Sequence, residues 1–140
     1  MIRNAELSDL PELLTLLEEA YADTPFSNMG YNADYVSERY TLIVSMSDKF
    51  FRKVVVEDGK IVGVLLGIID ANFWGIPMGQ TIVSYSRRDT HTLVRQFVQW
   101  SKSKGAKQVT VVTVPGKERY AKLIDKLGFF ESGNFYTVEI

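Results

Sequence analysis

Hydrophobic and polar positions recur along the chain with two different periods. Near the N-terminus, apolar side chains recur every three or four residues, which is typical of an amphipathic helix that ends near Ala22: Leu10, Leu13, Leu14, Leu17 and Tyr21. Phe51–Glu57 and Lys60–Asp70 are instead rich in strand-forming residues, and Asp58-Gly59 between them is typical of a tight hairpin turn. The pattern therefore predicts a chain that contains both helices and a β-hairpin.

The other segments extend this pattern. Asp9 is expected to cap the first helix, with Pro11 in its first turn, and Gly105 is expected to end a later helix. Gln108–Val114 is apolar on both faces, as expected of a strand buried on both sides. The predicted strands are Ile2–Asn4, Gln80–Tyr85, Gln108–Val114 and Phe135–Ile140, and the predicted helices begin at Asn32 or Ala33 and cover Thr90–Lys104 and Lys117–Leu127.

These elements follow one another in the order β-α-α-β-β-β-α-β-α-β. Such an order predicts an α/β (α+β) fold in which helices flank a mixed, mostly antiparallel sheet. The 140 residues suffice for one compact domain, which we take to span residues 1–140.

Composition excludes several classes of protein and of site. The absence of cysteine excludes disulfides, thiolate metal sites and cysteine nucleophiles, and a single histidine, His91, excludes a multi-histidine metal site. The longest nearly continuous apolar run, Ile61–Ile69, is nine residues long, whereas a membrane span needs about 20. We therefore expect a cytoplasmic protein without a membrane partner and without a metal.

Charge is distributed unevenly although the net charge is only −1. Residues 1–50 carry a net charge of −6, and residues 51–140 carry +5. Between residues 84 and 108 the only acidic residue is Asp89, against six basic ones. A basic stretch of this kind suits an anionic ligand and an acidic region suits a cationic one, although a solvated helix face accounts equally well for the basic stretch.

Several segments in this order resemble the GNAT superfamily of N-acetyltransferases. Ile2–Ala5 with Asp9–Pro11 is similar to the family's opening strand and helix, Val55–Gly63 to its central hairpin, and Lys104–Val109 to the approach to its fifth strand. Tyr120–Phe129 resembles its closing Y-x-K-x-G-F motif. The segments 24–27 and 71–80 are also similar to acetyltransferases carried by bacteriophages.

This resemblance implies an acetyl-CoA site. In the family, acetyl-CoA lies where the fourth and fifth strands separate, and its pyrophosphate rests on backbone N–H groups at the start of the third helix, where the helix dipole favours an anion. The implied cofactor-binding residues of this chain are Ile82, Val83, Tyr85, Ser86, Arg87, Arg88, Asp89, Thr90 and Lys117.

The phosphate motif departs from the family pattern. The family has Q/R-x-x-G-x-G/A before this helix, whereas this chain has Tyr85-Ser86-Arg87-Arg88-Asp89-Thr90, without either glycine. Glycine there allows a phosphate to approach the backbone closely. Arg87 and Arg88 compensate, in our interpretation, by pairing with phosphate directly.

The implied general acid also departs from the pattern. The family's tyrosine lies four residues before the glycine of the closing motif, and this chain has Ile124 there. Tyr120 lies one helical turn earlier on the same face, and either replaces that tyrosine or is an ordinary core aromatic. Asp70 and Ser84 are the other catalytic candidates, Asp70 as an amine-binding group or base.

Five aromatic residues are candidates for the acceptor pocket, or else for sealing the edge of the core. They belong to the two loops that the resemblance places beside the acceptor: Tyr21, Phe26, Tyr31, Phe73 and Trp74.

The sequence therefore predicts an N-acetyltransferase that uses acetyl-CoA as co-substrate and acts on an amine of a small molecule or peptide. The alternative is a catalytically degenerate protein of GNAT fold that works by binding, for example one of phage origin. A nucleic-acid partner ranks third, because only the local basic stretch favours it. Pairing of the edge strand Phe135–Ile140 with its copy makes a homodimer possible.

Overall fold

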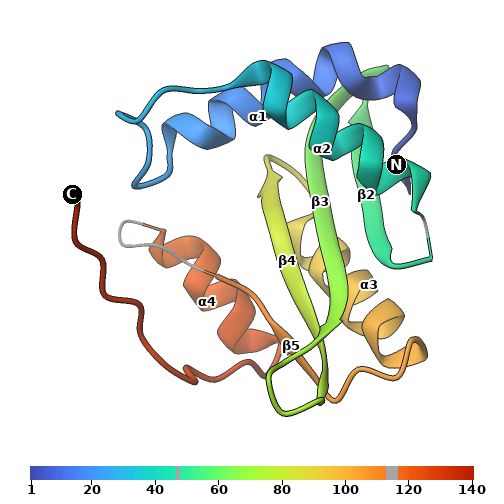
Figure 1. Cartoon of the computed structure of the whole chain (residues 1–140). Coiled ribbons are helices and arrows are strands. Elements are labelled where there is room, and N and C mark those ends of the chain that lie inside the picture. The colour runs from blue at the N-terminus through green and yellow to red at the C-terminus, as the bar shows by residue number, and fades with distance from the viewer. Residues whose placement is uncertain (47, 113–116) are drawn as a thin grey trace.

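The computed structural model describes residues 1–46, 48–112 and 117–140 (Figure 1). Five strands form one sheet: β1 (Ile2–Asn4), β2 (Phe50–Glu57), β3 (Lys60–Ala71), β4 (Pro77–Ser86) and β5 (Gln108–Thr110). The α-helices are α1 (Leu10–Ala22), α2 (Ala33–Ser45), α3 (Thr90–Ser103) and α4 (Glu118–Lys126), and a 3-10 helix, Leu7–Asp9, precedes α1.

The strands lie in the order β1-β2-β3-β4-β5 across the sheet. β1 to β4 are antiparallel, and β5 is parallel to β4. Asp58 and Gly59 make the tight turn between β2 and β3, both with positive φ angles (52° and 74°), as this turn type requires. The described part of the chain thus confirms the predicted mixed, mostly antiparallel sheet.

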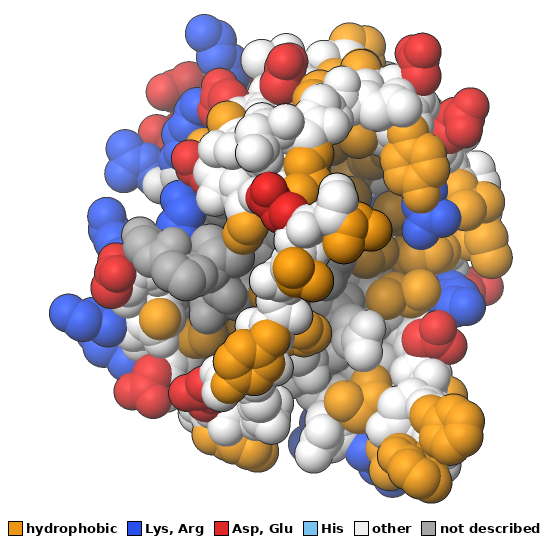
Figure 2. Space-filling view, turned by 60° about the vertical axis from the view of Figure 1, so that its left-hand side comes forward, with side chains coloured by type: hydrophobic (Ala, Val, Ile, Leu, Met, Phe, Trp, Pro, Cys, Tyr) orange, Lys and Arg blue, Asp and Glu red, His pale blue; other side chains and the backbone are white. Residues whose placement is uncertain are grey.

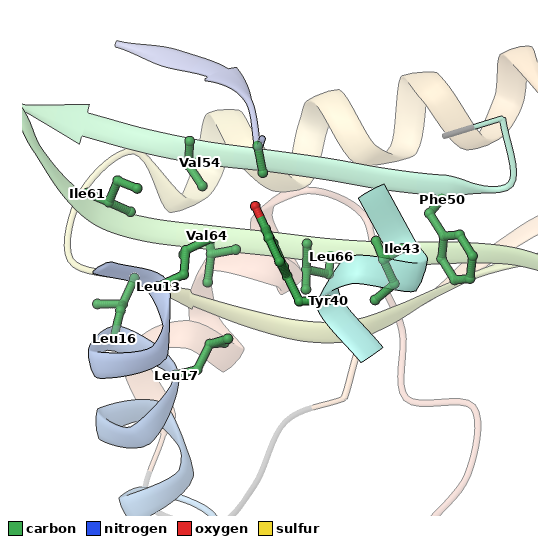
Figure 3. Packing of buried hydrophobic residues seen from close by; sticks show 11 residues of the cluster. Leu13, Leu16, Leu17, Tyr40, Ile43, Phe50, Val54, Ile61, Val64 and Leu66 are labelled. Atoms are coloured by element: carbon green, nitrogen blue, oxygen red, sulfur yellow. The ribbon is translucent and has the colours of Figure 1, made fainter. Parts of the chain in front are cut away.

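Helices cover both faces of the sheet, and a separate apolar cluster lies beneath each pair of helices (Figure 1). Side chains of α1 and α2 pack against β2 and β3 on one face, where Tyr40 points across the cluster (Figure 3). On the other face Phe97 of α3 packs against Phe51, with Tyr120 of α4 and Leu127, which follows α4, alongside. α4 therefore lies on the same side of the sheet as α3.

The start of α1 differs from the prediction. Pro11 lies in its first turn as expected, but the Asp9 side chain makes no capping hydrogen bond to α1. Asp9 instead accepts two hydrogen bonds from the Arg3 guanidinium and one from the Glu6 N–H, all at 2.8 Å. These donors lower the pKa of Asp9, the Arg3 hydrogen bonds most. The Asp9 carboxylate therefore binds Arg3 of β1 in preference to capping α1.

Two strand predictions were wrong: one strand is shorter than predicted, and the other does not form. β5 ends at Thr110 and Val112 is half exposed, while residues 113 and 114 of the predicted strand lie outside the described residues. Phe135–Ile140 forms no strand, and its apolar side chains are exposed. Its alternating pattern suits a strand, but a strand also needs a partner edge, and β5 at the sheet's edge has only three residues.

No helix in the described part of the chain is long and apolar enough to cross a membrane.

Candidate functional site

β4 is paired along only part of its length on the side of β5. The β5 ladder covers Met78–Gln80, so residues 81–86 have no strand beside them on that edge among the described residues. A bulge at Ile82 shifts the register with β3, because Leu66 pairs with Val83 and Gly67 pairs with Thr81. Bulges leave backbone groups unpaired and are common next to binding sites. Because β5 pairs only with Met78–Gln80, the edge of β4 that faces β5 is open to hydrogen bonding by a ligand beyond that point.

The side chains of this open segment point to different faces. Val83 and Tyr85 pack against the cluster beneath α1 and α2. Ser84 belongs to the opposite face, because it pairs with Leu65 of the cluster beneath α3. Ile82, at the bulge, is 45% exposed. Ser84 thus directs its side chain away from the α1–α2 core, as do Thr81 and Ser86, which pair with Gly67 and Gly63 on the same face.

Tyr120 of α4 lies beside Ser84. Its hydroxyl is buried and makes no hydrogen bond to any residue that the structure describes. Burial raises the pKa of Tyr120, and the nearby Ser84 hydroxyl opposes this rise although the two groups lack full hydrogen-bond geometry. A buried hydroxyl without a partner is costly, and such groups are found where a ligand supplies the partner. Tyr120 and Ser84 are therefore the candidate reactive pair on the open edge of β4.

The loop between β4 and α3 is held by its own side chains. The Ser86 hydroxyl donates to the Arg88 carbonyl and accepts from the Arg88 N–H, and the Thr90 hydroxyl donates to the Ser86 carbonyl at 3.4 Å. A Cβ atom on Gly63 of β3 would meet the Ser86 hydroxyl at 2.0 Å, so glycine at 63 makes room for this turn. Asp89 at the helix start has a left-handed backbone (φ 56°) and makes no capping hydrogen bond.

The two arginines of this loop are paired with acidic residues. Arg87 forms an ion pair with Glu19 of α1, and Arg88 forms one with Glu57 at 3.2 Å. Both arginine side chains are more than half exposed. Exposed ion pairs of this kind contribute little stability, so an arriving phosphate can displace the carboxylates.

The loop between α1 and α2 borders the same end of β4. Lys117 at the start of α4 pairs with Asp23 of this loop at 3.1 Å. The rings of Tyr21 and Tyr31 lie 5.4 Å apart, and the Tyr21 hydroxyl donates to the Phe26 carbonyl. The Phe26 side chain is half exposed. Burial raises the pKa of Tyr31. Ion pairs therefore join the β4–α3 loop to α1 and the start of α4 to the end of α1.

Comparison with known proteins identifies the architecture. No family model matches the sequence, and a search of curated proteins finds no match. Among solved structures, a putative acetyltransferase from Agrobacterium tumefaciens str. C58 superposes with a TM-score of 0.76 at 18% identity, over 100% of this chain and 99% of the other. The chain has the fold of the GNAT acetyltransferases.

Two further structures share this GNAT fold. AAC(6')-Iy in complex with a bisubstrate analogue, CoA-S-monomethyl-acetylneamine, superposes with a TM-score of 0.79 at 17% identity, over 100% of this chain and 97% of the other. Glucosamine-6-phosphate N-acetyltransferase from Arabidopsis thaliana superposes with a TM-score of 0.71 at 21% identity, over 99% and 97%. At these identities the likeness concerns the fold.

Within the GNAT fold, the structure separates the aromatic residues that the sequence analysis grouped. Phe73 and Trp74 lie in the β3–β4 loop, at the opposite end of β4 from the α1–α2 loop (Figure 1). The ten residues of β4 put about 30 Å between its two ends. The prediction that Phe73 and Trp74 cluster with Tyr21, Phe26 and Tyr31 was therefore wrong, because the two loops follow opposite ends of the strand.

Asp70 is likewise not brought to the site. It pairs with Met78 near the β3–β4 loop, whereas Ser84 pairs with Leu65. Five residues of β3 separate the two positions by about 17 Å. Asp70 is exposed and accepts from the N–H of Ala71. The catalytic candidates that the fold brings together are Tyr120 and Ser84.

Sequence reasoning missed the acidic partners Glu19 and Asp23 and the bulge at Ile82. Nothing local to these residues marks them, since they depend on which segments the fold places together. A pocket of about 320 Å³ lies elsewhere, at the other side of the sheet, and is lined by Asn4, Phe50, Phe51, Arg52, Lys53 and Trp100. It does not border the open edge of β4.

Proposed function

We propose that this chain is a member of the GNAT superfamily that transfers an acetyl group from acetyl-CoA to an amine. The observation that carries the proposal is the buried, unpartnered Tyr120 hydroxyl beside Ser84 on the open edge of β4. The fold supports acyl transfer in general. The phage-type likeness and a cytoplasmic location in a bacterial cell or infected host belong to the same proposal, and rest on the sequence.

The proposed reaction is a direct transfer. The amine nitrogen attacks the thioester carbonyl, a C–N bond forms, the C–S bond breaks, and the oxygen charge of the transition state is held by a backbone N–H of β4. The amine gives up its proton to water. Tyr120, which is protonated at neutral pH because burial raises its pKa further, delivers a proton to the departing thiolate and regains one from solvent.

The charged residues around the open edge are consistent with binding of acetyl-CoA and of an amine. Arg87, Arg88 and the N-terminus of α3 lie at the end of β4 where the anionic part of acetyl-CoA would rest. Glu19 and Asp23 lie on the neighbouring α1 and its following loop. Release of these carboxylates from their cations would present negative charge to a protonated amine, on a small molecule or a peptide.

A binding protein without catalysis is the second candidate function. Asp89 at the start of α3 puts a carboxylate where the family carries a phosphate-binding glycine loop, and this favours loss of acetyl-CoA binding. The two candidates make opposite predictions for turnover.

The test is release of the CoA thiol by the purified protein, supplied with acetyl-CoA and a panel of primary amines. We expect amine-dependent release, and a kcat about 100-fold lower in Tyr120→Phe with a KM within about twofold of the parent, because only the proton donor is lost. Tyr136→Phe, which removes a hydroxyl from a 91% exposed tyrosine, is the matched control and should react as the parent does. Equal rates in Tyr120→Phe and the parent would remove Tyr120 from the mechanism, and no release with any amine would favour the binding protein.

A further inference from the structure

The β3–β4 loop presents two aromatic side chains to solvent at one end of the molecule. Phe73 is 91% exposed and Trp74 is 79% exposed, and Ile76 beside them is 41% exposed. Their place at the far end of β4 excludes them from the core and from the candidate site described above (Figure 1). Large apolar groups clustered in this way mark an interaction site more often than single exposed apolar residues do.

The loop is ordered by hydrogen bonds that leave its aromatic rings outside. The Asn72 side chain accepts from the N–H groups of Trp74 and Ile76 at 2.9 and 3.0 Å, and the Asn72 N–H donates to the Ile76 carbonyl at 3.0 Å. Gly75, with φ of 77°, closes the turn and donates to the Asn72 carbonyl. The rings of Phe73 and Trp74 pack edge to face, 5.0 Å apart. The exposed tip is therefore held in place before any partner arrives.

Three lysines lie next to this tip. The Lys107 N–H donates to the Pro77 carbonyl at 2.9 Å, at the base of the loop, and Lys102 and Lys104 lie at the adjoining end of α3. All three are exposed, and none forms an ion pair with a described residue. In Figure 2 hydrophobic side chains project at the lower end of the molecule, the end where Figure 1 places this loop, with basic side chains beside them.

We propose that this end of the molecule binds the surface of an anionic lipid bilayer. An aromatic and aliphatic tip that enters the headgroup region, flanked by unpaired lysines that meet acidic lipids, is the combination by which proteins bind such a surface. No membrane-spanning segment is needed, so the lack of a long apolar helix among the described residues does not bear on it. The expectation of no membrane partner rested on the short apolar runs alone, and surface binding replaces it in this proposal.

The geometry favours a bilayer over single-stranded nucleic acid. Bases stack on ring faces that line a basic groove. Here the two rings pack against each other at 85° on a projecting turn, so they suit insertion better than stacking. Contact at this end would leave the open edge of β4 accessible, because its residues 81–86 lie toward the other end of the strand. Membrane binding at this end therefore does not depend on the proposed acyl transfer at the other end.

The experiment measures sedimentation of the full chain with vesicles of phosphatidylcholine alone and of phosphatidylcholine mixed with phosphatidylserine. We expect binding to the mixed vesicles and at least tenfold weaker binding to the neutral ones. The chain has two tryptophans, so Trp100→Phe makes Trp74 the sole tryptophan reporter, and its emission should shift to shorter wavelength on binding. No binding to mixed vesicles, or no shift, would overturn the proposal.

Paired variants separate the two contributions. Phe73→Ala/Trp74→Ala should abolish binding, whereas Phe135→Ala/Tyr136→Ala, which truncates two side chains that are 86% and 91% exposed, should leave it unchanged. Lys102→Gln/Lys104→Gln/Lys107→Gln should weaken binding about 100-fold, at about fivefold per lysine. Lys53→Gln/Lys60→Gln/Lys122→Gln is the control for total charge, because Lys53 and Lys60 lie further along the β2–β3 hairpin from the tip, and circular dichroism confirms that each variant is folded.

Two outcomes would point to other partners and contradict the proposal. If the protein binds an oligonucleotide with loss in the lysine variant but ignores vesicles, the tip serves nucleic acid. If both sets of lysine changes weaken vesicle binding equally, the attraction is one of overall charge and the three lysines beside the tip have no specific part in it.

Discussion

At the scale of single residues, Tyr40 shows how one buried polar group is tied to the stability of the core. Its side chain is 1% exposed, and its hydroxyl donates to the Glu6 carbonyl at 2.5 Å, which joins α2 to the chain before α1 (Figure 3). Burial, with a smaller effect of the Asp9 charge, raises the pKa of Tyr40 to about 12. The folded protein therefore holds this proton more tightly than the unfolded chain does.

We predict that Tyr40 lowers the free energy of unfolding as the pH rises from about 10, where a tyrosine in the unfolded chain ionises, to about 12. In this window the unfolded chain binds fewer protons, so stability falls with a slope of up to about 1.4 kcal/mol per pH unit. Below pH 10 the contribution is constant. Urea denaturation at a series of pH values measures the slope.

The variant Tyr40→Phe should lose this part of the slope, and at pH 8 it should cost about 1–2 kcal/mol because the Glu6 carbonyl loses its donor. Tyr35→Phe, at a 58% exposed position of the same helix, should retain the slope of the parent. Equal slopes in Tyr40→Phe and the parent would show that Tyr40 ionises in the folded state as it does in the unfolded one.

At the scale of elements, the N-terminus of α3 favours a bound anion, whereas the negative charge of Asp89 at the same place repels one. Asp89 has φ of 56°, a conformation that suits glycine better, and its carboxylate makes no capping hydrogen bond. We predict that Asp89→Gly keeps the free energy of unfolding within about 0.5 kcal/mol and tightens acetyl-CoA binding about fivefold, because one negative charge leaves the phosphate end of the site.

Asp58→Gly is the control, since Asp58 also has a positive φ angle (52°) but lies in the β2–β3 turn. Calorimetric affinities of the two variants give the comparison. A weaker complex with Asp89→Gly than with the parent would mean that the Asp89 carboxylate helps to hold the ligand.

The C-terminal segment allows a test of the finding that Phe135–Ile140 forms no strand. Residues 131–140 are exposed and form no strand. Truncation after Phe130 is therefore predicted to change the free energy of unfolding by less than about 1 kcal/mol, measured by urea denaturation of the two chains. A loss of several kcal/mol would show that Phe135–Ile140 pairs as a strand after all.

Elements with local signals could be predicted from the sequence. Asp58-Gly59 and its flanking strands define the β2–β3 hairpin, Asn32 caps α2 by accepting from the Tyr35 N–H, and Gly105 with φ of 87° ends α3. The length of β5 and the fate of Phe135–Ile140 depend instead on whether a neighbouring edge is available. That is a property of the whole sheet, so the local pattern overestimated both.

The sequence could place candidate site residues on individual helices and strands, but it could not show which of these residues lie close together in the fold. Tyr120 and Ser84 were selected by their places on a predicted helix and strand, and the fold brings them together. Asp70, Phe73 and Trp74 were selected in the same way, but a strand of ten residues separates them from the site. Residues at the two ends of an extended strand lie far apart in space. The residue pattern does not show at which end of the strand the site lies.

At the scale of the whole molecule, ion pairs join segments around the open end of β4. Arg87 with Glu19 links the β4–α3 loop to α1, and Lys117 with Asp23 links α4 to the α1–α2 loop. Each pair is exposed and individually weak, so the two pairs connect these segments without holding them rigidly. The two functional ends proposed for the molecule, the open edge and the aromatic tip, lie at opposite ends of β4 (Figure 1).

The most direct measurement of the central claim is a calorimetric titration of the purified chain with acetyl-CoA. We predict one site of micromolar affinity, weakened at least tenfold in Arg87→Ala/Arg88→Ala and unchanged in Arg39→Ala/Arg95→Ala, which removes two charges from helix positions outside the β4–α3 loop. Absence of binding at millimolar acetyl-CoA would contradict the proposed acyl transfer.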